Sequence, residues 1–287
     1  MSASGSTRSF KAITRVVIQI GDTIFFEFRK NLKKLLFLLG FTAVFIYLNM
    51  FLVKGLMADL GIEDPETIKD YVSQQFAFFS TLLTISAAAF FGSIIVEDAE
   101  KRTGNIMFPK IGKDRLIVGR FIAIYLMFSF LILIYYASVV LTALSIYSDP
   151  IPKELWESFG WALFYALALS SFVTFISSIS KSVNISVVLS ILFLLIVFDI
   201  GTTIIMFSGS KIEPLFILTY HSNIITAVFD FPEQRYIEMD IYQGFEQLEG
   251  NIYRIWITPS VEGAFWALLI YTVGSLLLAY IFYRRKD

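Results

Sequence analysis

The sequence contains no cysteine and a single histidine, His221, among 287 residues. The absence of cysteine excludes disulfide bonds, thiolate metal sites and cysteine nucleophiles. One histidine cannot build a histidine metal cluster or a histidine-based catalytic triad within one chain. We interpret His221 as an ordinary polar residue at a membrane interface, with a ligand role as the alternative.

Charged residues are also scarce, at 16% of the chain, whereas hydrophobic residues make up 56% and the mean hydropathy is +0.71. This composition excludes an ordinary soluble domain and indicates an integral membrane protein. The first residues lack a continuous apolar run and a small-residue cleavage site, so we expect no signal peptide. No phosphate-binding loop is present, because Ile111-Gly112-Lys113 lacks the upstream glycine and the following hydroxyl.

Six apolar segments are long enough to cross a bilayer: 35–53, 76–96, 121–148, 158–180, 183–207 and 263–283. An α-helix needs about 20 apolar residues to cross a hydrocarbon core of about 30 Å. The sequence therefore predicts an all-α membrane protein whose six transmembrane helices occupy residues 35–287. The third segment is longer than a membrane requires and must tilt or project into water.

Residues 1–34 are predicted to form a polar tail followed by an amphipathic helix. From Phe10 to Phe28, apolar side chains recur at helical spacing, with basic and polar side chains on the opposite face. A helix with this pattern lies in the headgroup region of a membrane. The alternative is a soluble core helix, for which the chain offers little soluble protein to pack against.

Lysine and arginine are unequally divided between the two sides that six spans define. The side that holds both termini and residues 97–120 carries 17 of the 23 basic residues, and the other side carries six. The positive-inside rule then places both termini and residues 97–120 in the cytoplasm and the connection 208–260 outside. We expect a multi-pass protein of the cell membrane.

The outer connection 208–260 begins with a mostly apolar stretch, Pro214–Phe229, and continues with the acidic stretch Glu233–Glu249. Exposing the apolar stretch to water would be costly. We therefore expect Pro214–Phe229 to dip into the outer leaflet as a re-entrant or surface helix. The acidic stretch would then form a solvated cap.

The central segment, residues 97–120, is the longest charged stretch between two spans. It holds six basic and four acidic side chains. Thr103-Gly104 and Pro109 interrupt it, which predicts a short helix, a break and a second short helix. A structured polar segment between two spans is typical of a surface to which a soluble partner docks.

Asp199 is the one acidic residue deep within a predicted span. A carboxylate there is costly, which makes it a functional hypothesis: it could pair with a cation, bind a proton or bind substrate. The alternative is a hydrated carboxylate at the mouth of a water-filled cavity. Ser170 and Thr174 in the fourth span and Thr84 in the second could form a weakly polar wall of a substrate path, or could serve only close helix packing.

One set of residues resembles a pattern found in permease subunits of ATP-binding-cassette (ABC) type-2 exporters: Glu97, Lys101-Arg102-Thr103-Gly104, Pro109, Arg115 and Gly119-Arg120. The family pattern has an acidic residue leaving the second span, a Gly-Thr pair, a proline followed by a basic residue, and a Gly-Lys entering the third span. In this chain the pair is ordered Thr-Gly, and Arg120 replaces the lysine. The six-span layout resembles the family as well.

The resemblance implies that residues 97–120 form a cytoplasmic coupling segment. In that family two permease subunits associate, and each docks into a separate ATP-binding subunit whose closure switches the pathway. ATP and Mg²⁺ would be bound by that partner, so we expect neither a cofactor nor catalysis in this chain; membrane lipids are the other expected partner, and nucleic acid is not one. Glu97 is expected to cap the segment and Gly104 and Pro109 to set its bend. Arg115 and Arg120 would make ionic or phosphate-headgroup contacts, or would simply flank the spans as positive charges inside the cell. Arg102 and Thr103 belong to the same coupling set.

Other classes remain as alternatives. An ion-coupled carrier or channel could use Asp199 as its coupling site, although such proteins usually place more than one ionisable group at mid-membrane. An intramembrane enzyme would need paired carboxylates, a histidine cluster or a Ser/Lys dyad, and the spans contain none of these. A membrane anchor that recruits a cytoplasmic partner is also compatible with the sequence. The apolar spans favour a hydrophobic or amphipathic substrate, with export implied by the resemblance alone.

Overall fold

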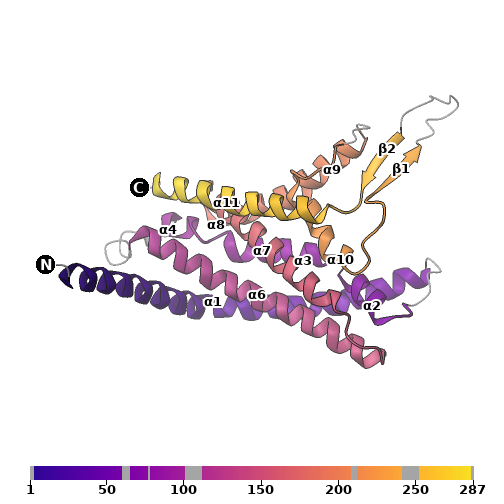
Figure 1. Ribbon diagram of the computed structural model, residues 1–287, viewed down its shortest axis with the longest axis horizontal. Helices are drawn as coiled ribbons and strands as arrows, with labels where there is room; N and C mark the ends of the chain where they lie inside the picture. Colours follow the sequence, from indigo (N-terminus) through magenta and orange to yellow (C-terminus); the bar gives the residue numbers. More distant parts are fainter. Residues whose placement is uncertain are drawn as a thin grey trace.

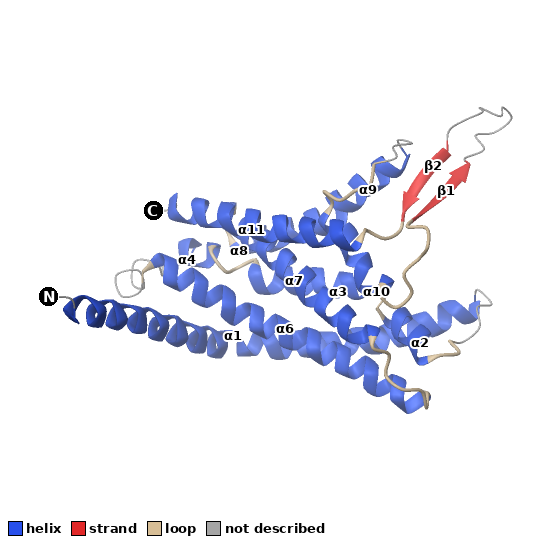
Figure 2. Cartoon of the chain, viewed as in Figure 1, coloured by secondary structure: helices blue, strands red, loops and turns tan. Residues whose placement is uncertain are grey.

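The computed structural model describes residues 3–59, 65–76, 78–100, 112–207, 212–240 and 252–285. These residues are mostly helical, with a two-stranded sheet at one end of the molecule (Figure 1, Figure 2). Within them, six helical regions are long and apolar enough to cross a membrane: Val16–Leu48, Ile68–Asp98, Asp114–Ile146, Glu154–Ile179, Val183–Ile205 and Val261–Arg285. The prediction of six apolar helical spans is therefore confirmed.

The first span belongs to one unbroken helix, α1, over Ala3–Asp59. At 57 residues it is about 85 Å long, well beyond the thickness of a bilayer. This corrects the expectation of an in-plane helix ending at residue 34 and a separate span starting at residue 35. Residues 30–35 contain no glycine or proline, so no helix-breaking residue interrupts α1 there. The charged side chain of Lys34 is accommodated because it donates to the carbonyl oxygen of Ala89 at 3.0 Å.

The second span is divided into three helices: α2 (Ile68–Gln75), α3 (Phe79–Phe91) and α4 (Val96–Glu100). Helix α2 begins where the hydroxyl of Thr67 accepts a hydrogen bond from the amide of Asp70 at 3.2 Å. Such a side-chain cap satisfies one of the free amides at a helix start. The span predicted over 76–96 therefore extends further on both sides and is not a single rod.

The break between α3 and α4 lies at residues 92–95 and is stabilised by the neighbouring helix α7 (Glu154–Ile179). The amides of Ile95 and Val96 both donate to the hydroxyl oxygen of Ser177 at 3.2 Å. Gly92 is needed at this point, because a Cβ atom there would lie 2.7 Å from Cγ2 of Val187.

The third span is α6 (Lys113–Ile146), which begins at Lys113 rather than at residue 121. The second half of the central segment is therefore the first two turns of α6, and not a separate short helix. Helix α6 runs parallel to α1 along much of its length (Figure 1). The sixth span is α11 (Val261–Arg285), which lies beside α7.

The fifth span bends through a π-helical turn. It consists of α8 (Val183–Leu192), the π-helix η1 (Phe193–Val197) and α9 (Phe198–Phe207). A π-helical turn changes which side chains face a given neighbour, and such turns are frequent at functional sites. Here the turn directly precedes Asp199.

The described part of the connection between the fifth and sixth spans contains two short helices and a β-hairpin. The 3₁₀-helix η2 (Leu218–Asn223) and α10 (Ile224–Ala227) pack against the helix ends, and Leu218 and Ile224 are fully buried. An antiparallel hairpin follows, formed by β1 (Tyr236–Asp240) and β2 (Ile252–Trp256). The prediction of a solvated acidic cap over Glu233–Glu249 missed strand β1, and β2 follows that stretch. The β-branched and aromatic residues of Ile252–Trp256 are typical of a strand.

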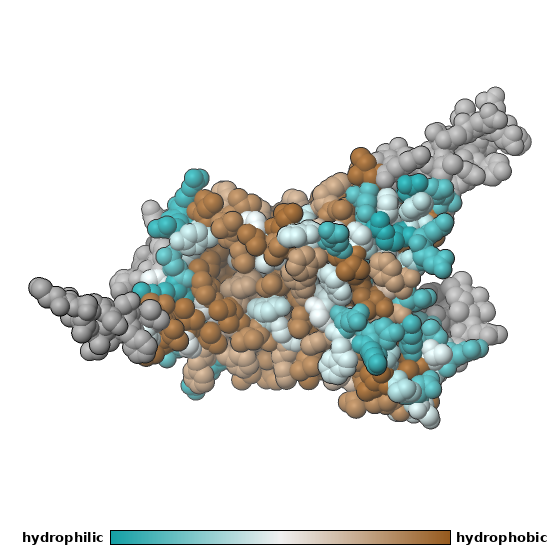
Figure 3. All heavy atoms as spheres, in the orientation of Figure 1, coloured by the Kyte–Doolittle hydropathy of each residue, from teal (hydrophilic) through white to brown (hydrophobic). Residues whose placement is uncertain are grey.

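The core lies where α3, α6 and α7 meet, and aromatic rings fill its hairpin end. Phe79 stacks on Tyr135 with 4.5 Å between ring centroids, and Phe76 lies 4.4 Å from Tyr136. The space-filling view shows hydrophobic side chains across the middle of the molecule and hydrophilic ones gathered towards its two ends (Figure 3). This distribution is that of a multi-pass membrane protein.

Candidate functional site

The structure has two sites of interest at opposite ends of the helices. At the end that holds both termini, charged side chains of α1, α4 and α6 form an ionic cluster of Glu27, Lys30, Glu97, Asp98 and Arg120. At the other end, a polar cavity lies beneath the hairpin. Figure 1 shows α4 and β2 at these two ends.

Arg120 is the centre of the ionic cluster. Its Nε donates to Oε1 of Glu27 at 2.7 Å, and its Nη1 donates to Oδ2 of Asp98 at 2.5 Å. The side chains of all three residues are at most 6% exposed. A buried charge is tolerated only when it is paired and hydrogen-bonded, so these three side chains hold one another in place.

The cluster extends from its buried centre towards the surface. Lys30 of α1 donates to Oε2 of Glu97 at 3.0 Å, and Asn31 donates to Oε2 of Glu27 at 3.1 Å. Glu100, at the end of α4, accepts a hydrogen bond from the amide of Val183 at 2.9 Å. The start of α8 is thereby tied to the same end of the molecule.

Helices α1 and α6 approach each other closely beside the cluster. A Cβ atom at Gly119 would lie 2.8 Å from Cβ and Cγ2 of Thr23, so a larger residue would push the helices apart. One turn earlier, the guanidinium of Arg115 donates to the side-chain oxygen of Gln19. The two helices therefore form one parallel pair.

The structure places part of the predicted coupling set in this cluster. Glu97, Arg115 and Arg120 all contact α1, and for Arg120 the contact is ionic and internal to the protein, not with a headgroup. The other predicted members lie outside the described residues: Arg102, Thr103, Gly104 and Pro109. Sequence reasoning missed Glu27, whose signal was a carboxylate placed between the apolar side chains of Phe26 and Phe28.

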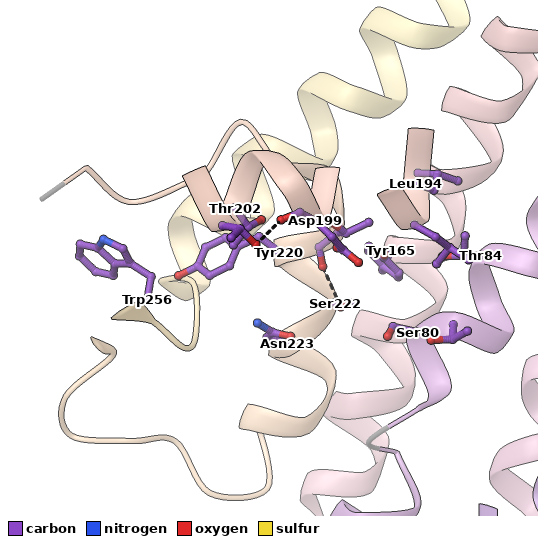
Figure 4. A pocket seen from close by; sticks show the side chains of 14 residues that line it. Ser80, Thr84, Tyr165, Leu194, Asp199, Thr202, Tyr220, Ser222, Asn223 and Trp256 are labelled. Atoms are coloured by element: carbon purple, nitrogen blue, oxygen red, sulfur yellow. Dashed lines mark hydrogen bonds between the residues drawn. The ribbon is translucent and has the colours of Figure 1, made fainter. Parts of the chain in front are cut away.

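The cavity at the hairpin end has a volume of about 360 Å³, is open on one side and is lined by residues of α3, α7, the π-helical turn, α9, η2 and β2 (Figure 4). Most of its lining side chains carry hydroxyl groups, and Asp199 supplies the only charge among the residues that line it. The lining residues are Ser80, Thr81, Thr84, Tyr165, Leu194, Leu195, Asp199, Thr202, Thr203, Thr219, Tyr220, Ser222, Asn223 and Trp256.

Two lining residues have buried polar atoms that make no well-formed hydrogen bond among the described residues: the hydroxyl of Tyr165 and Nε1 of Trp256. Tyr165 is fully buried, with Thr84 and Ser222 beside it. Tyr220 is different, because its hydroxyl donates to Glu213 at 3.4 Å. Burial, followed by the negative charge of Glu213, raises the pKa of Tyr220, so Tyr220 is a neutral hydrogen-bonding group at ordinary pH.

The structure separates the predicted pathway residues into two groups. Asp199 and Thr84 both line the cavity. Ser170 and Thr174 do not, because both are fully buried and donate to carbonyl oxygens of their own helix, Ala166 at 2.6 Å and Ser170 at 2.7 Å. The positions of Ser170 and Thr174 therefore fit close helix packing and not the wall of this cavity.

His221 is not at an exposed interface. It is fully buried beneath the connection, where its Nε2 lies 2.8 Å from the carbonyl oxygen of Leu215. Burial lowers the pKa of His221, which favours the neutral imidazole. No group of three or more histidine, aspartate or glutamate side chains in the described part of the chain could hold a metal ion.

The six apolar helices and the hydrophobic band define the class of this chain, which is a multi-pass helical membrane protein. The chain matches no protein-family model and no curated protein. Its function must therefore be argued from the ionic cluster and the cavity.

Proposed function

We propose that this chain is the permease subunit of an ABC transporter and is coupled through the central segment, residues 97–120, to a separate ATP-binding subunit. The transporter would contain two permease copies in the cell membrane, with both termini and the central segment in the cytoplasm. ATP and Mg²⁺ would be bound by the partner subunit. The resemblance of the central segment to type-2 exporters suggests the direction of transport.

The observation that carries this proposal is the ionic cluster. Asp98 lies near the start of the central segment and Arg120 is its last residue, so the undescribed residues 101–111 lie between these two. Their ion pair ties the two ends of the segment together, and Glu27 ties both to α1. A push on such a segment would move α1, α4 and α6 as one body, which is the rigid-body motion that coupling to an ATPase requires.

The connection over 212–240 suits the extracellular side in this arrangement. Its apolar residues Leu218, Ile224 and Phe229 are buried, whereas Phe216 and Phe231 are exposed. Helices η2 and α10 enter the molecule without crossing it. Irregular backbone at membrane depth is tolerated where it is buried in protein or lines a cavity. We propose that η2 and α10 form a re-entrant element of the outer leaflet.

The test is co-purification with an ATP-binding subunit encoded beside this chain. Wild-type chain is expected to carry the ATPase through affinity purification and to stimulate its ATP turnover. Arg102→Glu, a charge reversal within the central segment, should abolish both effects. Lys153→Glu is the matched control, since this exposed residue lies at the opposite end of the molecule and should leave both effects intact.

An equal loss in both variants would contradict docking through the central segment, and an ATPase that never associates would overturn the assignment. The second candidate, an ion-coupled carrier that uses Asp199, is favoured by the cavity around that residue. It predicts transport by purified chain in vesicles without any ATPase, driven by an ion gradient and lost in Asp199→Asn. The ABC proposal predicts no such transport.

A further inference from the structure

The cavity beneath the hairpin has an unbalanced charge. Asp199 has no ion-pair partner among the residues that the structure describes, and no basic side chain lines the cavity. The nearby arginines are already paired: Arg235 with Glu213 at 2.8 Å, and Arg254 with Glu238 at 2.7 Å. Asp199 is exposed at the open side of the cavity but lies within a membrane span, where a lone carboxylate is costly and calls for a counter-charge.

The lining offers further groups that could bind a ligand. The hydroxyl of Tyr165 is fully buried at the cavity wall and makes no well-formed hydrogen bond in the described structure, although the hydroxyl groups of Ser222 and Thr84 lie beside it. A buried polar group normally has a partner, so an unpartnered one at a cavity marks a place for a ligand atom. The aromatic rings of Tyr220 and Trp256 also line the cavity, and Trp256 already has a cation contact, with the guanidinium of Arg235 5.4 Å from its ring centroid.

We propose that this cavity binds a head group that carries an ammonium cation and at least one hydroxyl. Asp199 pairs with the ammonium, and the hydroxyl groups of Tyr165, Thr84 and Ser222 bind the hydroxyl. A volume of about 360 Å³ is at the small end of the range for ligand pockets, which suits a head group rather than a whole lipid. That the cavity is the cargo site of a transporter rests on the proposed function. That the cavity binds this head group does not depend on it.

The polar lining refines the substrate expected from the apolar spans. A hydrophobic molecule without a polar head would leave Asp199 and the surrounding hydroxyl groups without partners, which costs free energy. In an amphipathic molecule with an ammonium head, the head can pair with Asp199 in the cavity while the apolar part contacts the apolar spans. The ammonium group is present both in a soluble amino alcohol and in the head group of phosphatidylethanolamine. In the lipid the alcohol oxygen is esterified to phosphate, so there it can only accept hydrogen bonds from the hydroxyl groups of the cavity.

The test measures binding of choline to the full-length chain in nanodiscs of phosphatidylglycerol by titration calorimetry. The neutral isostere 3,3-dimethylbutan-1-ol is the matched ligand control, since it has the shape and the hydroxyl of choline without the charge. We expect choline to bind and the isostere to bind at least about 10-fold more weakly, as the loss of a charge-assisted contact implies. Equal binding of the two, or no binding of choline and ethanolamine, would overturn the proposal.

Three variants assign the binding to the cavity. Asp199→Asn keeps the shape of the side chain and should weaken choline at least about 10-fold while leaving the isostere unchanged. Tyr165→Phe removes only the buried hydroxyl and should weaken both ligands several-fold. Asp230→Asn, at an exposed aspartate that does not line the cavity, should change neither. Full choline binding in Asp199→Asn would refute the proposed site, and unchanged melting temperatures would show that the variants are folded.

A second arm distinguishes the two sources of the head group. Nanodiscs that contain phosphatidylethanolamine should compete with choline if a lipid head group enters the cavity, and should leave choline binding unchanged if the ligand is soluble. Binding is measured without any ATPase, so its failure is separate from a failure of ATPase co-purification. Asp199→Asn should still co-purify with the ATP-binding subunit.

Discussion

Arg120 and Glu27 form a buried ion pair between α6 and α1, with Nε of Arg120 2.7 Å from Oε1 of Glu27. The same guanidinium binds Asp98, so one side chain joins three helices. Replacing a buried ion pair by apolar residues is often harmless, but removing one partner leaves an uncompensated charge. Loss of Arg120 alone would therefore leave two buried carboxylates without a counter-charge.

Arg120→Gln should destabilise the protein by about 3–5 kcal/mol, because the carboxylates of Glu27 and Asp98 lose their shared counter-charge. The free energy of unfolding in detergent or nanodiscs measures this loss. Lys30→Gln is the control, since the Lys30 side chain is 34% exposed and its ion pair should be worth no more than about 1 kcal/mol. Equal costs for the two variants would mean that the cluster is not a structural centre.

Gly119→Ala should separate α1 from α6, because the new Cβ atom would lie 2.8 Å from the side chain of Thr23. Overpacking of this kind costs about 1–3 kcal/mol. Adding Thr23→Gly removes the clashing atoms and should recover part of the loss in a double-mutant cycle. Gly160→Ala, where a Cβ atom meets nothing within 4 Å, should instead stabilise α7 by about 0.5–1 kcal/mol.

Ser177→Ala should loosen the break between α3 and α4, because the amides of Ile95 and Val96 would lose the oxygen that both use. Leaving buried donors unsatisfied costs about 1–3 kcal/mol. Amide hydrogen exchange at Ile95 and Val96 should accelerate in the variant. Ser178→Ala is the control, since its hydroxyl only donates to Phe175 of its own helix, and unchanged exchange in Ser177→Ala would contradict the role of Ser177.

His221 should make stability depend on pH. Its pKa is lowered by burial in the folded state, against an opposing effect of Glu213, so the unfolded chain takes up a proton first as the pH falls. Its contribution is therefore constant above the ordinary value of 6.5 and is lost as the pH falls below it. His221 is the only histidine, so melting temperatures between pH 8 and pH 5 isolate this group.

The control for His221 is His221→Gln, which keeps a donor for the carbonyl of Leu215 but does not titrate in this range. The pH-dependent step below 6.5 should disappear in this variant. A step of the same size in the variant would assign it to carboxylates elsewhere in the chain.

Several features of the fold could be predicted from the sequence because they depend on local composition. Runs of about 20 apolar residues mark helices that can cross a membrane, and all six spans were found in this way. The ends of the helices were less predictable, since neither the continuity of α1 through Lys30 and Lys34 nor the break at Gly92 follows from apolar runs. In both cases contacts with other helices decide the outcome.

The functional sites also divide into features that the local sequence predicts and features that depend on contacts between helices. The sequence singled out Asp199 because a charge in an apolar run is visible locally. For Arg120 it predicted an ionic or phosphate-headgroup contact, with a simple flanking charge as the alternative. It could not show that Arg120 is buried between Glu27 and Asp98, or that Ser170 and Thr174 bind their own helix while Thr84 faces Asp199 across a cavity.

By itself, the sequence determined that this chain is a helical membrane protein with six apolar spans, a charged central segment and one carboxylate within a span. Only the tertiary structure decided which charges pair, which hydroxyl groups reach the cavity and where the second and fifth spans break. The physical reason is that apolar burial is set by composition along the chain, whereas an ion pair or a cavity wall requires residues far apart in sequence, such as Glu27 and Arg120, to meet in space.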